Sequence, residues 1–379
     1  MQFTFPNKLL IVCAISASLF TSCDEKEDVK YDIPSTYTFE RDGSSSVSFS
    51  GQTARLDMLA EIKAYLKTGD SGQQLDAAVL LNMFSNTGNP FSDEALNTSG
   101  KQIEDKTSAA DVTFYKNLFE EAEAVSKTTV DASIGTGGQM LRVSSQAYIN
   151  VNAKGWEFTQ MVEKGLMGAL IYNQIFNSYL TETKIGADVD NTVIVDGKNY
   201  TTMEHHWDEA FGYWGVPVDF PQGSPVLEES EDRFWAEYTE SRDADLGVAD
   251  KIMTAYITGR AAIVANDHET KMAQIDVIAE GLELVAAATG IHYINSALTD
   301  LNAQDQGNMF HHLSEGYGFI NALKYIPNAQ ISATEINTIL TVDFGTDGNF
   351  WEVDAESLAS AKSTLTTAYP DLASIADTL

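Results

Sequence analysis

Apolar residues recur every three or four positions over most of the chain after residue 50. The first such series is Leu56, Leu59, Ile62 and Leu66. This spacing places the apolar side chains on one face of a helix, and Gly69 stands where that helix would end. The same pattern predicts further helices over residues 74–84, 111–125, 155–180, 231–238, 245–264, 269–298, 308–325, 333–340 and 355–367.

The helix predicted over residues 155–180 has an unusual pattern. Its first part carries Glu157 and Glu163, but from Gly165 onward it has no charged residue. A helix that is apolar on all sides usually lies at the centre of a large core. We therefore expect this helix to be central, with Gly165 and Gly168 allowing close packing against a neighbouring helix.

One segment of the chain predicts a pair of strands. Residues 193–200 read VIVDGKNY, and Asp-Gly between β-forming residues is the strongest short signal for a hairpin. The rest of the chain lacks the alternation of strands and helices that marks an α/β protein. The predicted fold class is therefore all-α with one small β-hairpin.

The composition excludes several kinds of protein and partner. Of the 379 residues, 44% are hydrophobic, which is enough for a large core and excludes a wholly disordered chain. Asp and Glu number 55 against 23 Lys and Arg, so the formal net charge is -32 at pH 7. Because phosphate groups are bound by Lys and Arg, this charge argues strongly against nucleic acid and anionic membrane surfaces as partners.

The N-terminus has the pattern of an export signal. The apolar run Leu9–Phe20 is 12 residues long, too short for a permanent membrane span, and Thr21, Ser22 and Cys23 follow it. This order resembles a lipoprotein signal peptide with its lipobox. The resemblance implies that residues 1–22 are removed and that Cys23 carries the lipid. The alternative is an ordinary secretory signal with a chance cysteine.

The sequence after this cysteine is expected to hold the protein away from the membrane. Residues 24–28 read DEKED. They are either a solvated spacer or, by resemblance to Bacteroidetes lipoproteins, a signal for export to the outer face of the outer membrane. Residues 23–49 are predicted to form an acidic tether, and residues 50–379 the helical domain. Cys13 and Cys23 are the only cysteines, so the mature domain has no disulfide and no thiolate metal ligand.

Four of the six histidines form two adjacent pairs. They begin the segments HHWDEAFGY at residues 205–213 and HHLSEGYGF at residues 311–319, which share both histidines, the glutamate and a glycine. Composition alone predicts about 0.1 such pairs in this chain. We therefore expect an internal repeat, offset by 106 residues, that gives the fold two related helical halves.

Each segment places imidazole and carboxylate groups on one face of a helix. A histidine and a glutamate three or four residues apart are neighbours on a helix surface. Imidazole together with carboxylate is a ligand set for iron, zinc or manganese. The predicted metal ligands are His206, Glu209, His312 and Glu315, with His205 and His311 as second ligands or as hydrogen-bond partners that orient the first.

Other acidic residues could complete such a site. Helix-bundle metal sites take additional carboxylates from neighbouring helices, and Glu157 and Glu163 are candidates for that role. Glu204 and Asp208 add negative charge beside the first segment, which would favour a cation. Two other interpretations remain open: the histidines belong to a buried polar network, or they bind a different ligand.

The known catalytic motifs are incomplete or absent. His268 and Glu269 begin like the zinc-binding motif HExxH, but Met272 stands in place of the second histidine. The chain contains no GxSxG, no GxxxxGK[ST] and no GxGxxG. We therefore assign no catalytic residue, and the sequence favours a binding protein over an enzyme.

The chain resembles imelysin-like proteins and, over nearly the whole mature chain, an uncharacterised family of Bacteroidetes lipoproteins related to them. The resemblance is carried by YTF at 37–39, SGQTARL at 50–56, KGLMGA at 164–169 and HHWDEAFGY at 205–213. Imelysin-like proteins have a GxHxxE motif followed by aromatic residues and Trp-Gly. His206 and Glu209 match this motif, whereas Glu204 replaces its glycine and Trp214-Gly215 falls one residue late. The resemblance implies an imelysin-like pair of helical bundles with a pseudo-twofold internal repeat, and a link to iron uptake.

These observations lead to one expected function and two alternatives. We expect an outer-membrane lipoprotein anchored through Cys23, either at the cell surface or facing the periplasm. It would bind a metal ion or an iron-containing ligand as an accessory to uptake, with an outer-membrane transporter as partner. The first alternative is a metal-dependent hydrolase with Glu209 or Glu315 as general base. The second is a non-catalytic surface protein that binds glycans and whose histidines belong to the core.

Overall fold

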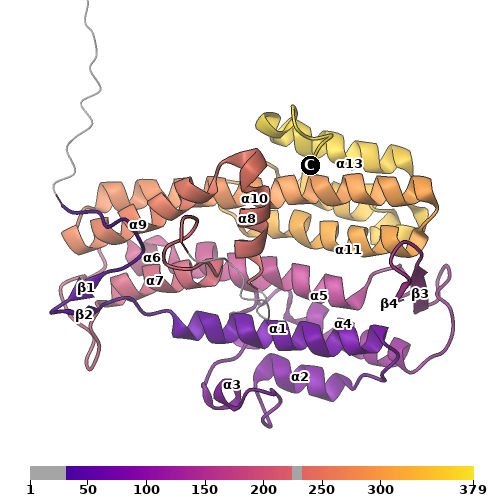
Figure 1. Cartoon of the computed structure of the whole chain (residues 1–379), viewed down its shortest axis with the longest axis horizontal. Coiled ribbons are helices and arrows are strands. Elements are labelled where there is room, and N and C mark those ends of the chain that lie inside the picture. The colour runs from indigo at the N-terminus through magenta and orange to yellow at the C-terminus, as the bar shows by residue number, and fades with distance from the viewer. Residues whose placement is uncertain (1–30, 224–232) are drawn as a thin grey trace, which may run out of the picture. The chain divides into compact units, whose positions relative to one another are not determined.

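The computed structural model describes residues 31–223 and 233–379. The predicted signal peptide, residues 1–22, the lipidation site Cys23 and the acidic run at 24–28 lie outside the described residues. The chain from Ile33 onward forms one compact unit, and most of its regular structure is helical (Figure 1). The predicted all-α fold class is therefore confirmed.

The helices are α1 (Ser50–Asp70), α2 (Ala77–Ser85), α3 (Glu94–Thr98), α4 (Val112–Ser126), α5 (Phe158–Leu166), α6 (Glu182–Ile185), α7 (Thr202–Trp214), α8 (Trp235–Leu246), α9 (Ala249–Ala265), α10 (His268–Ala303), α11 (Gln306–Ala322), α12 (Ala333–Thr338) and α13 (Ala355–Ala368). Two short antiparallel sheets pair β1 (Glu40–Arg41) with β2 (Ser44–Ser45) and β3 (Gly138–Arg142) with β4 (Ala147–Val151).

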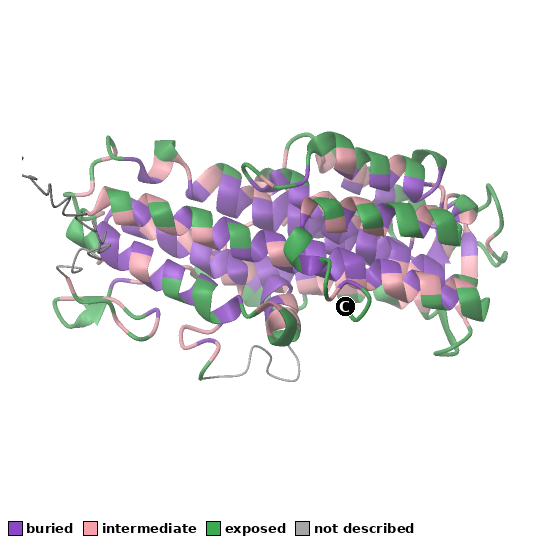
Figure 2. Ribbon diagram, turned by 90° about the horizontal axis from the view of Figure 1, so that it is seen from above, coloured by how far each residue is buried: buried purple, intermediate pink, exposed green. Residues whose placement is uncertain are grey.

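The predicted central helix is present, but it is not a regular α-helix throughout. It begins as α5 and continues through the π-helical segments Met167–Tyr172 and Ile175–Tyr179. Helices α1 to α4 lie on one side of it, and α11 followed by α10 and α13 lie on the other (Figure 1). Buried residues run along the middle of the molecule (Figure 2), and nearly all of this helix is buried.

Two glycines allow the close packing that the sequence predicts at this helix. A Cβ atom on Gly168 would lie 2.8 Å from Cα of Ala322, the last residue of α11. A Cβ on Gly165 would lie 2.6 Å from the hydroxyl of Tyr115 in α4. Contacts this short do not occur in packed proteins, so a larger residue would displace the backbone of α11 at Gly168 and the Tyr115 side chain at Gly165.

Helix α10 is the longest helix and is part of the core. It is long and apolar enough to cross a membrane by length and hydropathy, and within the described residues it is the one helix that meets this criterion. However, 78% of its most apolar stretch is buried inside the protein. This burial is the pattern of a core helix.

Residues 33–49, which were predicted to belong to the tether, pack on the helical unit instead. The ring of Tyr37 is fully buried and stacks on Phe211 with 3.7 Å between ring centroids. Its hydroxyl donates a hydrogen bond of 2.8 Å to Asp208. The unit therefore begins at Ile33 rather than at residue 50. The partners of Tyr37 lie on α7, so no local sequence pattern could show this contact.

The predicted hairpin at residues 193–200 is reduced to a turn. The N–H of Val195 donates to the carbonyl of Tyr200, and Ile194 forms a single bridge with Thr201. Val193 is 64% and Ile194 40% exposed, so the apolar side chains of the first predicted strand gain little from packing. The five-residue hairpin of the fold is β3–β4, which the sequence analysis did not predict.

Candidate metal centre

The two histidine segments lie on different helices in different surroundings. The first is on α7, which packs against α1, α9 and the segment Ile175–Tyr179. The second is on α11, which packs against α5 and α10. In the part of the chain that the structure describes, the hydrogen-bonding partners of the first segment are all different from those of the second. The six predicted ligands therefore form two separate groups.

In the second segment a carboxylate holds each imidazole at Nδ1. His311 Nδ1 lies 2.6 Å from Glu157 Oε2, and His312 Nδ1 lies 2.6 Å from Asp300 Oδ2. When its partner carboxyl group is ionised, each imidazole donates to it through Nδ1–H and keeps the lone pair on Nε2. Metal-binding histidines in proteins are commonly oriented by a carboxylate in this way.

Glu315 brings a carboxylate to the same place. Its Oε2 lies 3.4 Å from His311 Nε2, and its Oε1 accepts a hydrogen bond of 3.1 Å from the hydroxyl of Tyr293. One ligand atom from each of His311, His312 and Glu315 lies within 4.8 Å of the other two. Three donors bound to one ion at about 2.1 Å are about 3.4 Å apart in a tetrahedral site. Movements of about 1 Å by each side chain would therefore bring all three to a single ion.

Burial favours the uncharged form of each of these groups. Burial raises the pKa of Glu157 to about 8, although the nearby Arg142 opposes this shift. Burial also raises the pKa of Glu315. It lowers the pKa of His311 to about 4, and it lowers the pKa of His312 as well. Both imidazoles are thus neutral near pH 7, and a cation placed among the carboxyl groups would stabilise their ionised forms.

Only one of the two additional carboxylates predicted on the central helix joins this cluster. Glu157 does so through His311. Glu163 Oε1 instead accepts from Lys164 at 2.7 Å and lies 3.1 Å from Lys63 Nζ. Burial alone would raise the pKa of Glu163, but these two ammonium groups lower it below its usual value. Glu163 is therefore an ionised partner of two lysines.

The sequence analysis missed two residues that shape the cluster, Asp300 and Tyr293. Both lie on α10 and are seven residues apart, so they lie on the same face of this helix. That spacing was visible in the sequence. However, nothing in the sequence indicated that this face of α10 packs against the histidine face of α11.

The first segment forms a hydrogen-bonded network. His206 Nδ1 lies 3.2 Å from Glu209 Oε2, and Gln52 donates to Glu209 Oε1 at 3.0 Å. His205 Nδ1 lies 3.0 Å from the carbonyl oxygen of Ser48. Burial would raise the pKa of Glu209, but the His206 hydrogen bond and the His205 charge lower it. Among residues 31–223 and 233–379, a group of three ligand atoms this close is found only in the second segment.

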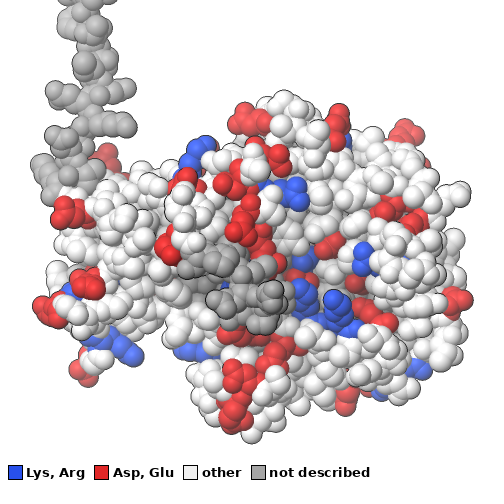
Figure 3. Space-filling view, viewed as in Figure 1, with Lys and Arg blue, Asp and Glu red and all other residues white. Residues whose placement is uncertain are grey.

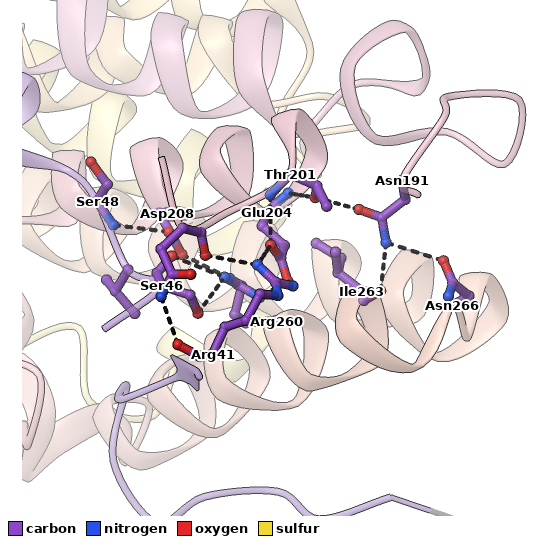
Figure 4. A network of polar contacts seen from close by, with 12 residues as sticks. Arg41, Ser46, Ser48, Asn191, Thr201, Glu204, Asp208, Arg260, Ile263 and Asn266 are labelled. Carbon is purple, nitrogen blue, oxygen red and sulfur yellow. Dashed lines mark hydrogen bonds and ion pairs between the residues drawn. The ribbon is translucent and has the colours of Figure 1, made fainter. Parts of the chain in front are cut away.

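The acidic residues beside the first segment are neutralised by arginines (Figure 4). Arg260 donates to Asp208 at 2.9 Å and to Glu204 at 3.1 Å, and the side chains of all three are at most 1% exposed. Arg41 forms two further hydrogen bonds with Glu204, of 2.8 and 3.0 Å. The prediction that Glu204 and Asp208 favour an additional cation is therefore wrong, because the protein supplies the cations itself.

A cavity of about 290 Å³ reaches the second segment. His311 and Glu157 contribute to its wall, together with residues of α1, β3 and β4. The exposed residues Lys67 and Tyr148 also line it, so it opens to the surface. The cluster on α11 thus borders a space that a solute can enter, and it faces α5 and α10 on its other sides.

Comparison with known proteins gives a family but no described activity. No curated protein and no solved structure matches the chain significantly. One family model matches residues 34–372, which is nearly the whole of the compact unit. The chain therefore belongs to the family described as Domain of unknown function (DUF4856).

Proposed function

We propose that the second histidine segment binds a divalent metal ion through His311, His312 and Glu315. The observation that carries this proposal is the proximity of the three ligand atoms, within 4.8 Å, in a cluster where each imidazole is already oriented by a carboxylate. Two histidines and one carboxylate leave coordination positions open, as in non-haem iron and mononuclear zinc sites. Such a site suits an exchangeable ion of iron, zinc or manganese, or an iron-containing ligand that completes the coordination from the cavity.

The proposed biological role is that of a lipid-anchored accessory to metal uptake. The export signal and lipobox that end at Cys23 support anchoring to the outer membrane of a Gram-negative bacterium. The resemblance to imelysin-like proteins and to Bacteroidetes lipoproteins supports a link to iron, with an outer-membrane transporter as the partner that receives the metal. Labelling with a radioactive fatty acid tests the anchor: the native chain is expected to be labelled and Cys23→Ala is not.

The metal site is tested by measuring bound metal on the full-length chain purified in detergent. The protein is incubated anaerobically with Fe²⁺, Zn²⁺ or Mn²⁺ and desalted, and its metal content is read by mass spectrometry. We expect about one ion per chain, which His311→Ala/His312→Ala loses. The matched control is His205→Ala/His206→Ala, the same change in the first segment, which should keep the ion.

Two results would contradict the proposal. One is a wild-type chain that retains no metal under any of these conditions. The other is an equal loss of metal in both double variants at unchanged helicity. Because removing two partly buried histidines could also unfold the protein, Glu315→Gln is measured in parallel. This variant keeps the shape of the side chain and removes only its charge, and it should weaken metal binding without changing the circular dichroism spectrum.

A further inference from the structure

The cavity beside His311 gathers positive charge in a strongly acidic protein. Lys63, Lys67 and Arg142 all line it, although the chain as a whole carries a net charge of -32. Figure 3 shows the blue side chains gathered near the middle of this face, where α1 runs, with red side chains spread around them. Cations grouped around a concave surface attract anionic solutes more strongly than the same cations scattered over a flat one.

Some N–H groups of these side chains are available as hydrogen-bond donors to a ligand. Arg142 donates through Nε to Asn308 at 2.8 Å, and its two terminal nitrogens have no partner among the described residues. The exposed Lys67 forms no ion pair with any residue in the described ranges. Lys63 Nζ lies 3.1 Å from Glu163 Oε1, which also accepts from Lys164. A planar guanidinium with two free nitrogens is suited to a carboxylate group.

The same wall also presents hydrogen-bond acceptors. Asp70 and Glu157 line the cavity, as does Gln160, whose buried amide oxygen accepts no hydrogen bond from the described residues. Asp70 already accepts from the Asn150 N–H at 2.8 Å and from the Thr159 hydroxyl at 3.3 Å, yet a carboxylate has further acceptor positions. An inorganic anion would place its oxygens against these acceptors, whereas a ligand with hydroxyl groups would donate to them.

The size of the cavity and its lining limit the ligand further. A volume of about 290 Å³ is at the lower end of small-molecule pockets, enough for a metabolite or a single sugar ring. Tyr148 is 49% exposed and contributes a ring against which an apolar face of such a molecule can pack.

We propose that this cavity binds a small hydroxy-carboxylate, with carboxylate groups on Arg142 and Lys67 and hydroxyl groups on Asp70 and Gln160. Two sources share this chemistry: a free hydroxy acid such as citrate, and a uronic acid residue of a polysaccharide. The residues that would bind it are not the three proposed metal ligands, so the inference does not depend on the metal site. It is tested on protein from which metals have been removed.

The experiment is isothermal titration calorimetry on the full-length chain in detergent, after treatment with a chelator and dialysis. Citrate and galacturonate represent the two sources, and tricarballylate has the carboxylates of citrate but lacks its hydroxyl. We expect at least one of the two hydroxy-carboxylates to bind with a Kd below about 1 mM. Tricarballylate should bind at least about tenfold more weakly than citrate if citrate is the ligand. Galacturonate that binds more tightly than citrate would identify the polysaccharide as the source.

Two variants test the position of the ligand. Arg142→Gln and Lys67→Gln should each weaken binding, the former by about tenfold or more because it removes the paired donors. Lys251→Gln is the matched control, since Lys251 is an exposed lysine on α9 away from the cavity, and it should bind like the wild type. Lys67 is also exposed, so its substitution leaves the fold intact even if Arg142→Gln does not. The proposal is overturned if neither hydroxy-carboxylate binds at about 10 mM, which is about tenfold above the expected upper limit of the Kd. It is also overturned if Lys67→Gln and Arg142→Gln bind the ligand as tightly as Lys251→Gln does.

Discussion

The contact between α5 and α11 positions the cluster of His311, His312 and Glu315, and Gly318 makes that contact possible. A Cβ atom at Gly318 would lie 2.3 Å from Cβ of Lys164 and 2.7 Å from its backbone carbonyl carbon. We therefore predict that Gly318→Ala destabilises the protein, because the clash involves the backbone and cannot be relieved by rotating a flexible side chain. His311 lies on α11 and Glu157 immediately precedes α5, so the same change should separate these two residues.

The magnitude follows from two opposing effects. Relieving the clash requires the helices to separate by about 1 Å, and overpacking of this kind costs up to about 3 kcal/mol. Replacing glycine by alanine inside a helix raises the free energy of unfolding by about 1 kcal/mol, because it restricts the unfolded chain. The expected net loss of stability is about 2 kcal/mol. At Gly316, two residues earlier on α11, the nearest atom to a new Cβ is Tyr293 Cβ at 3.2 Å. There the two effects nearly cancel.

The assay is urea unfolding followed by far-ultraviolet circular dichroism, with Gly316→Ala as the matched control. Gly318→Ala should lower the free energy of unfolding by about 2 kcal/mol, while Gly316→Ala stays within about 0.5 kcal/mol of the wild type. Metal content measured on the same samples should fall for Gly318→Ala. The reasoning is refuted if Gly318→Ala is as stable as the wild type, or if the two variants lose the same stability.

Three further changes test other parts of the structure. Burial raises the pKa of Asp70 to about 7, so ionising this group destabilises the folded state as the pH rises from about 4 to 7. Asp70→Asn should be no more stable than the wild type at pH 4 and about 4 kcal/mol more stable at pH 8.5 in urea unfolding, and an equal effect at both pH values would contradict this. Arg260→Met leaves the buried carboxylates of Asp208 and Glu204 with one cation fewer and should cost about 3–5 kcal/mol in the same assay; a loss below about 1 kcal/mol would show that the network is dispensable. Asp300→Asn removes the charge that orients His312 and should weaken metal binding by about 10- to 100-fold in a competition titration, and unchanged affinity would refute that role.

The helices that the sequence predicted well are those with a strong local signal. The apolar series that begins at Leu56 became α1, and the uncharged stretch after Gly165 became the buried centre of the fold. Such patterns succeed because the position of each apolar residue depends only on its neighbours along the chain. The hairpin predicted at residues 193–200 was wrong because the pairing of strands depends on more than their neighbours along the chain. Its turn signal was correct, but strands also need a surface to pack on, and that surface is set by distant segments.

The candidate site shows the same division between local and distant information. The spacing within each segment correctly placed a histidine and a glutamate on one helix face. It could not reveal which residues from other helices meet them, and these partners separate the two copies. His311 and His312 each meet a carboxylate from another part of the chain, Glu157 or Asp300. In the first copy, His205 meets a backbone carbonyl instead.

This difference between the copies argues against inferring a metal site from the repeated letters alone. An imidazole that donates to a carboxylate becomes a better base at its other nitrogen, whereas one that donates to a carbonyl gains less. In the first copy Glu209 also receives hydrogen bonds from His206 and Gln52, so its negative charge is already balanced by protein donors. In the second, burial holds Glu315 at a raised pKa, so the carboxyl group would gain from a cation. The same short motif is therefore better suited to a structural network on α7 and to a ligand site on α11, and the surrounding helices decide between them.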